Sequence, residues 1–178
     1  DLHSFPTRRS SDLEPGGGCY VVGNRALTGR HGIAGEWGQV VIEPNGEPSP
    51  HGTRGTVEAY VAGPALESFY ERVANTRRTL RDIASRTDED AAASATVERL
   101  QEYFARSLAV IINTFDPHAI VVGGGVGNLD LVYSERTRQR IAALIFAPRF
   151  ETPILKPSLG DSAGVFGAAL LGTAGRER

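Results

Sequence analysis

FDPHAIVVGGG, residues 115–125, combines a helix stop, a short apolar run and a glycine-rich turn. Pro117 ends the helix before it, because proline cannot continue the hydrogen-bond ladder. Ala119–Val122 is typical of a parallel strand buried between helices. Gly123, Gly124 and Gly125 follow at once, and α/β folds bind ligands where a strand ends and glycine allows close approach. The stretch predicts an α/β fold, although such a turn can also be only a turn.

A helix pattern precedes this stretch. Its apolar residues follow i, i+3, i+4, i+7 spacing, namely Val97, Leu100, Phe104, Leu108, Ile111 and Phe115. This spacing is typical of an amphipathic helix with one buried stripe. Thr87 begins a Thr-x-x-Asp sequence, which predicts the cap of this helix. Two shorter helices are expected over residues 58–73, around Gly63-Pro64, and over residues 77–85.

Short apolar runs at both ends of the chain predict strands. Cys19–Val22 and Ala26–Thr28 flank Gly23-Asn24, a turn pair that favours a β-hairpin. Gln39–Ile42 is expected to be a third strand. Downstream, a helix, a strand and a helix are expected over residues 129–146, 153–156 and 162–171. With right-handed crossovers, this order predicts a mixed sheet with helices on its faces.

Composition excludes several function classes. A length of 178 residues and 40% hydrophobic content fit one globular domain. The net charge of −2 gives no attraction to nucleic acid or to an anionic membrane. The apolar runs are too short to span a bilayer. The single cysteine, Cys19, fits a reducing compartment and predicts a cytoplasmic protein.

The first thirteen residues, DLHSFPTRRSSDL, do not follow the pattern of the rest. They show no apolar periodicity, and each of them matches one reading frame through a common sequencing-library adapter. We therefore expect residues 1–13 to be a non-native tail. The domain itself is expected over residues 14–178. A natural basic tail that includes Arg8 and Arg9 is the alternative.

Four separated motifs indicate a family. They are GEWGQ (35–39), SPHGTRGTVE (49–58), the stretch at 115–125 and LGDSAGVFGAA (159–169). Together they resemble the ROK family of sugar kinases and related repressors, and the stretch from 104 to 170 is most similar to bacterial fructokinases. The resemblance implies the carboxyl-terminal domain of the actin-like ATPase (ribonuclease H-like) fold. It also implies an ATP- and Mg²⁺-dependent kinase for a hexose such as fructose or glucose, which forms a homodimer.

The same resemblance implies roles for individual residues. Glu36 and Glu58 would bind sugar hydroxyls, because an ionised carboxylate accepts several hydrogen bonds. An exposed or salt-bridged carboxylate is the alternative. Gln39 stands where the family has a sugar-contacting histidine. Gly123, Gly124 and Gly125 would lie on the adenosine side of ATP, and Asn128 is expected to be a helix N-cap.

A zinc site is the point at which the chain departs from the family. The resemblance implies one histidine and three cysteines as zinc ligands, and Gln39, Ser49, His51 and Thr56 occupy those positions. An amide and two hydroxyls are poor zinc ligands. The sequence therefore predicts that no zinc is bound. His51 binding a metal together with other partners is the alternative.

Phosphoryl transfer is expected to need more than this chain. In the family, a preceding domain supplies a phosphate loop and the catalytic base, and no segment here matches either. Gly16-Gly17-Gly18 follows Pro15, which has no backbone donor for phosphate. We therefore expect the chain to bind ligands without turnover. A sugar-sensing ROK repressor and a sugar-binding pseudokinase are the alternatives to a kinase.

Overall fold

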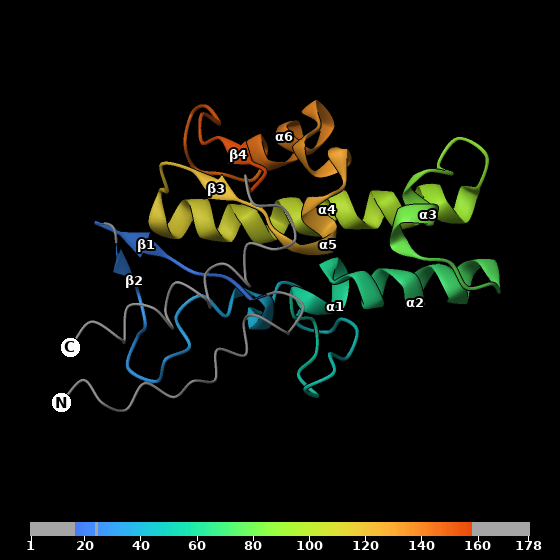
Figure 1. The fold of residues 1–178 in the computed structure, drawn as a ribbon, viewed down its shortest axis with the longest axis horizontal. Helices are drawn as coiled ribbons and strands as arrows, with labels where there is room; N and C mark the ends of the chain where they lie inside the picture. The colour runs from blue at the N-terminus through green and yellow to red at the C-terminus, as the bar shows by residue number, and fades with distance from the viewer. Residues whose placement is uncertain (1–16, 24, 158–178) are drawn as a thin grey trace, which may run out of the picture.

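The structure is a computed structural model, which describes residues 17–23 and 25–157. In chain order its elements are β1 (Val21–Val22), β2 (Arg25–Ala26), the 3-10 helix η2 (Trp37–Gln39), α1 (Glu58–Val61), α2 (Gly63–Ala74), α3 (Leu80–Ala84), α4 (Ala91–Phe115), β3 (Ile120–Val121), α5 (Gly124–Gly127), the 3-10 helix η3 (Asp130–Tyr133), α6 (Glu135–Ala142) and β4 (Ile154–Leu155). The long helix α4 lies at the centre (Figure 1). Helix α6 and the β3–β4 pair lie on one side of it, and α1 and α2 lie on the other. The proposed tail at 1–13 and the helix expected over 162–171 lie outside the described residues.

The predicted stripe of α4 forms the main core. Leu100, Phe104 and Leu108 are buried, whereas Phe115 at the end of the helix is 49% exposed. The predicted start is wrong, because the N-cap is Asp90 and not Thr87. The Asp90 carboxylate accepts hydrogen bonds from the backbone N–H groups of Ala92 and Ala93 at 2.9 and 3.1 Å. A side-chain oxygen at this position pairs with donors that the first turn leaves without partners.

The strands form two separate pairs in the part of the chain that the structure describes. The predicted hairpin is confirmed, with Val21 opposite Ala26 in β1 and β2. Strands β3 and β4 pair in parallel, with Ile120 opposite Ile154, as the crossover predicts. The third strand expected over Gln39–Ile42 is wrong, because Gln39 belongs to the 3-10 helix η2 and the described residues 40–42 form no strand. Only an isolated bridge between Val41 and Thr56 follows, so the hairpin has no third strand among the described residues.

Two predicted helices are interrupted by caps. The helix over 58–73 is broken at Ala62, whose backbone is extended, and Pro64 lies in the first turn of α2. The helix over 129–146 is divided at Ser134, whose side chain accepts a hydrogen bond from the Thr137 N–H and begins α6. The short helix expected over 77–85 is α3, capped by Thr79. Side-chain caps therefore set the starts of α3 and α6, whereas α2 begins after Ala62 without one.

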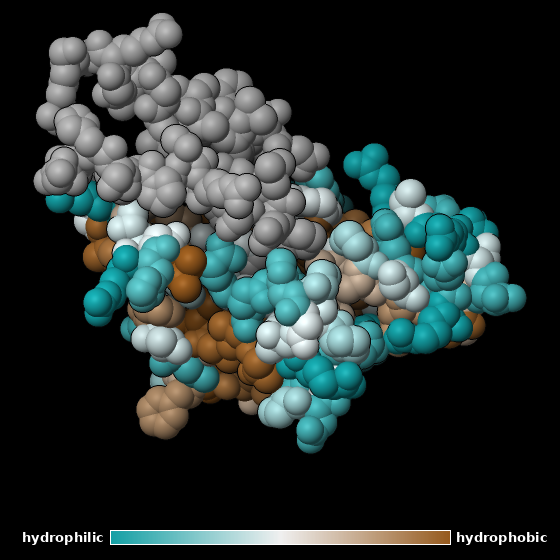
Figure 2. All heavy atoms as spheres, turned by 90° about the horizontal axis from the view of Figure 1, so that it is seen from below, coloured by the Kyte–Doolittle hydropathy of each residue, from teal (hydrophilic) through white to brown (hydrophobic). Residues whose placement is uncertain are grey.

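Apolar side chains also lie on the surface. The face in Figure 2 has a brown apolar area bordered by teal hydrophilic side chains. Val121 of β3 is 60% exposed, so the prediction of a buried strand is wrong. Phe146, which follows α6, is 97% exposed. Within the described ranges, no helix is both long and apolar enough to cross a membrane.

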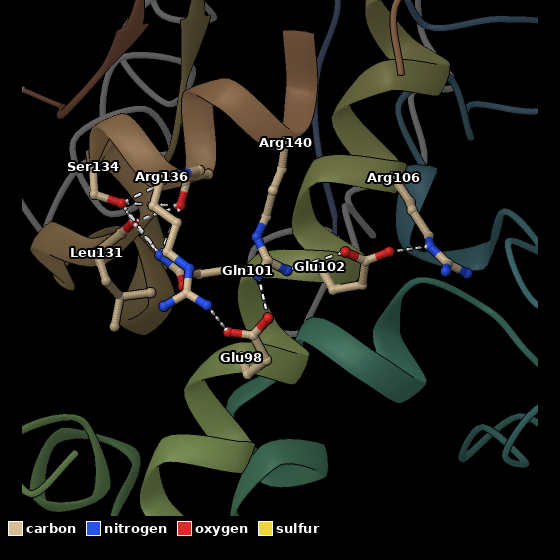
Figure 3. A network of polar contacts seen from close by, with 9 residues as sticks. Glu98, Gln101, Glu102, Arg106, Leu131, Ser134, Arg136 and Arg140 are labelled. Atoms are coloured by element: carbon tan, nitrogen blue, oxygen red, sulfur yellow. Dashed lines mark hydrogen bonds and ion pairs between the residues drawn. The ribbon is translucent and has the colours of Figure 1, made fainter. Parts of the chain in front are cut away.

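Charged side chains connect α4 to α6 (Figure 3). Glu98 of α4 pairs with Arg136 and Arg140 of α6, and Glu102 pairs with Arg140 at 3.0 Å. Buried Gln101 donates hydrogen bonds across the same seam to Ser134 and Thr137. The hydrogen bond from Arg140 holds the pKa of the Glu98 carboxyl below its ordinary value. These contacts fix α6, and the segment that leads into it, against α4.

Candidate functional site

Glu58 is a buried carboxylate at the start of α1. Its side chain is only 3% exposed. The Gln39 amide Nε2 donates a hydrogen bond to Oε2 of Glu58 at 3.0 Å. The second oxygen, Oε1, is buried and accepts no hydrogen bond from the residues that the structure describes. Because a buried carboxylate oxygen needs a donor, Oε1 is suited to accept a hydrogen bond from a hydroxyl group of a ligand.

Backbone pairing brings Gln39 and Glu58 together across nineteen positions in sequence. The Val57 N–H donates to the Val40 carbonyl at 2.9 Å, next to the bridge between Val41 and Thr56. Because an ionised carboxylate only accepts, the Gln39 amide must turn its nitrogen toward Glu58. The carbonyl oxygen of Gln39 is then the part of this amide that can accept a hydrogen bond from a hydroxyl group.

Glu36 lies on the same segment as Gln39 but makes a different set of contacts. It precedes η2, and its carbonyl accepts from the Gln39 N–H at 3.1 Å. Its side chain lines a mainly apolar cavity of about 330 Å³ beside Trp37 and Phe115. No hydrogen bond or ion pair joins the Glu36 carboxylate to Glu58 among the described residues. The structure therefore brings two of the three predicted sugar ligands, Gln39 and Glu58, into direct contact.

The positions at which the family implies zinc ligands lie around Glu58. His51 Nε2 lies 4.0 Å from Glu58 Oε2, and Ser49 Oγ accepts from the His51 backbone N–H at 3.2 Å. Thr56 Oγ1 is buried and has no hydrogen-bond partner within residues 17–23 and 25–157. Only His51 among these donors is an ordinary zinc ligand. The residues do not fit a zinc ion, and the described parts of the chain contain no group of three His, Cys, Asp or Glu residues that suits a metal.

The glycine turn lies at the carboxyl end of β3. Gly124 has a φ of +71°, in the left-handed region that favours glycine. A Cβ atom built at Gly123, Gly124 or Gly125 would meet nothing within 4 Å, so open space adjoins this backbone. Such a surface fits the close approach of a flat group such as adenine. Asn128 is the C-cap of α5 and not a helix N-cap, so that prediction is wrong.

Tyr133 supports the glycine turn, and sequence reasoning missed it. Its hydroxyl lies 2.8 Å from the Gly127 carbonyl and 3.2 Å from the Val122 carbonyl. Lys156 lies 5.2 Å from the centre of the Tyr133 ring and forms an ion pair with Asp130. The hydrogen bond that Lys156 donates to Asp130 lowers the pKa of the Asp130 carboxyl. Asp130 and Tyr133 lie close to the turn in sequence, but their contacts have no sequence signal, and only the tertiary structure brings Lys156 to them.

Comparison with known proteins identifies the family. The model of the ROK family matches residues 15–174. The chain belongs to the ROK family. It is 32% identical to an N-acetyl-D-glucosamine kinase of Yersinia pseudotuberculosis over 183 aligned positions, which cover 96% of the chain and 60% of that relative. The chain thus spans less than two thirds of the length of this ROK kinase.

Solved ROK structures have the same fold. The ROK glucokinase of Streptomyces griseus, in complex with glucose and AMPPNP, is 28% identical and superposes with a TM-score of 0.77 over 87% of this chain and 56% of its own. A ROK transcriptional regulator, a homologue of the E. coli MLC protein, is 25% identical with a TM-score of 0.72, over 89% of this chain and 43% of its own. The predicted actin-like ATPase fold is confirmed. These relatives do not support the predicted likeness to fructokinases.

Proposed function

We propose that this chain is the sugar-binding part of an ATP-dependent hexose kinase. The observation that supports this proposal most is the buried Glu58 carboxylate, which has Gln39 on one oxygen and no donor from the described residues on the other. A carboxylate in this state is suited to a sugar hydroxyl. The kinases among its relatives support the same reaction class.

Each predicted ligand has a role in this proposal. Glu58 accepts from a sugar hydroxyl, Gln39 orients Glu58 and offers its carbonyl, and Glu36 accepts from a second hydroxyl. The exposed turn at Gly123–Gly125 contacts the adenosine part of ATP. Mg²⁺ would neutralise phosphate charge during transfer. The catalytic base and the phosphate loop belong to a part of the protein outside this chain, so the chain alone binds without turnover.

N-acetylglucosamine or glucose is the substrate that we propose. One relative is an N-acetyl-D-glucosamine kinase, and another was solved with glucose. Both sugars have pyranose rings with adjacent hydroxyl groups that suit neighbouring acceptors.

We further propose a cytoplasmic homodimer that binds neither nucleic acid nor membrane and contains no zinc. Residues 1–13 are proposed to lie outside the domain, which the start of the family match at residue 15 supports. Resequencing the genomic DNA across the boundary between residues 13 and 14 tests whether residues 1–13 are a non-native tail.

A sugar-sensing repressor is the second candidate. The ROK regulator superposes on most of this chain, so the carboxyl-terminal fold is common to both classes. A kinase has a catalytic aspartate in the preceding region, and a repressor has a helix-turn-helix there. The upstream gene sequence therefore decides between the two candidates.

A coupled ADP-release assay tests the kinase proposal. The protein extended to the length of its relatives is assayed with N-acetylglucosamine, glucose, mannose and fructose. We expect turnover with N-acetylglucosamine or glucose above that with fructose. Glu58→Gln should lower kcat/KM roughly 10- to 100-fold, because it weakens a charge-assisted hydrogen bond. No ADP release with any of the four sugars would contradict the proposal.

A further inference from the structure

The loop between Gln39 and Glu58 is folded tightly without a metal. The Glu43 N–H donates to the Gly55 carbonyl at 3.1 Å, and the Gly55 N–H donates to the Glu47 carbonyl at 2.8 Å. Gly55 has a φ of +73°, and a Cβ atom there would overlap the Glu43 carbonyl. Residues 43–55 therefore close on themselves at their base. We call this segment the 43–55 loop.

Glu47 anchors this loop to three helices. Its backbone N–H donates to the Tyr60 hydroxyl of α1 at 2.9 Å. Its carboxylate pairs with Arg72 of α2 at 2.9 Å and with Arg99 of α4 at 3.1 Å. A second anchor joins Glu43 to Arg106 of α4, also at 3.1 Å. The two glutamates thus attach the amino-terminal part of the 43–55 loop to the helical core.

Arg99 is the least solvated of these cations. Its side chain is 12% exposed, and its guanidinium lies 4.4 Å from the Tyr60 ring centre and 4.6 Å from that of Phe69. Tyr60 in turn stacks on Tyr103 at a centroid distance of 3.9 Å. A guanidinium that is largely removed from water and packed on aromatic rings gains a cation–π attraction that an exposed one lacks. Arg99 therefore fixes Glu47 and Tyr60 together.

We propose that these contacts hold this segment in place, the role that the resemblance to the ROK family assigns to a structural zinc ion. The anchoring residues Glu43, Glu47, Tyr60, Arg99 and Arg106, which we call the arginine clamp, hold the 43–55 loop in place. Tyr60 lies two residues after Glu58 on α1, so the clamp also fixes the start of the helix that presents Glu58. Glu47 and Arg99 are then positioning residues for the sugar site. That last step rests on the proposed function, whereas loop anchoring does not.

Limited trypsin digestion of the purified chain tests the anchoring. Arg54 lies in the loop and is exposed, and Arg149 is exposed in a segment remote in sequence, so its cleavage rate is an internal reference. We expect Glu47→Ala to speed cleavage after Arg54 roughly tenfold relative to Arg149, as for a loop that opens more often. Glu71→Ala, which removes an exposed pair with Arg77 outside the loop, should leave this ratio unchanged. EDTA should not change it in the wild-type chain.

A second variant and a sugar titration test the clamp independently of Glu47→Ala. Arg106→Ala loosens the second anchor and should also speed cleavage after Arg54, which covers the case in which Glu47→Ala fails to fold. Unchanged cleavage in both variants, or faster cleavage of the wild type in EDTA, would overturn the clamp. Glucose and N-acetylglucosamine binding, followed through the single tryptophan Trp37, separates the two proposals. If the variants are cleaved faster after Arg54 but the wild-type chain binds no sugar, only the proposed function is refuted. Unaltered sugar affinity in a loosened variant refutes only the positioning of Glu58, and Glu47→Gln should restore part of any lost affinity.

Discussion

Gly55 and Gly52 lie three positions apart in the same loop, and both have a φ in the left-handed region, at +73° and +85°. They differ in surroundings. A Cβ atom at Gly52 would meet nothing within 4 Å, whereas one at Gly55 would overlap the Glu43 carbonyl. A residue with a Cβ atom would therefore suffer backbone strain from the positive φ at both positions, but steric overlap only at Gly55.

This pair gives a prediction at the scale of a residue. Gly52→Ala should lower the free energy of unfolding by about 1 kcal/mol, the usual cost of a left-handed backbone for a residue with a Cβ atom. Gly55→Ala should cost distinctly more, because the loop base must also move. Urea denaturation followed by circular dichroism measures both variants. Equal losses at the two positions would show that the packing around Gly55 is looser than described.

The resemblance to the ROK motifs implied Glu36, Gln39 and Glu58 as site residues, but it did not imply how they are arranged. The contact between Gln39 and Glu58 depends on backbone pairing between Val40 and Val57, which lie far apart in sequence. The burial of Glu58 depends on the packing of α1 between the loop and α4. Neither feature has a local sequence signal. The side-chain types were therefore predictable, and the buried Glu58 oxygen that has no donor among the described residues was not.

At the scale of an element, the start of α4 separates two possible caps. The sequence Thr87-x-x-Asp90 resembles a capping box, yet the backbone is still in a turn at Arg86, whose carbonyl accepts from the Asp90 N–H at 3.0 Å. The helix begins only at Ala91. The prediction was wrong because a short polar residue at either end of this sequence can cap a helix, and the preceding turn decides which one does.

Asp90→Ala should therefore destabilise the chain more than Thr87→Ala. We expect a loss of about 1 kcal/mol in the free energy of unfolding for Asp90→Ala, since the first turn of α4 loses its cap. Thr87→Ala should cost much less. Chemical denaturation monitored by the helical circular dichroism signal compares them. A larger loss for Thr87→Ala would contradict the boundary of α4.

The seam between α4 and α6 predicts a dependence of stability on pH. The hydrogen bond from Arg140 lowers the pKa of Glu98 below its ordinary value of 4.5, so the folded chain favours the ionised carboxylate. The stabilisation from Glu98 is thus complete above pH 4.5 and is lost as the pH falls through the lowered pKa. Glu98→Gln should flatten the fall in unfolding free energy below pH 4.5. Glu89→Gln, at an exposed site before α4, is the control, and an equal flattening there would contradict the assignment.

At the scale of the whole molecule, four motifs in order were enough to predict the family and the fold class, because they follow one another at the distances typical of the family. The connectivity of the sheet was not predictable to the same extent. The strands are two residues long, and the segment after η2 pairs with Thr56 and Gly55 rather than with the hairpin. Short strands have few apolar alternations, so their partners depend on the tertiary structure.

We propose that this chain contains a hexose site built on Glu58. Titration of the chain with N-acetylglucosamine and with glucose, followed by Trp37 fluorescence, tests it directly because Trp37 lies between Glu36 and Gln39 in η2. We expect saturable binding of at least one sugar by the wild-type chain, and binding that is weaker by roughly tenfold or more in Glu58→Gln. Saturable binding of equal affinity in both proteins, or no saturable change in the wild type, would contradict it.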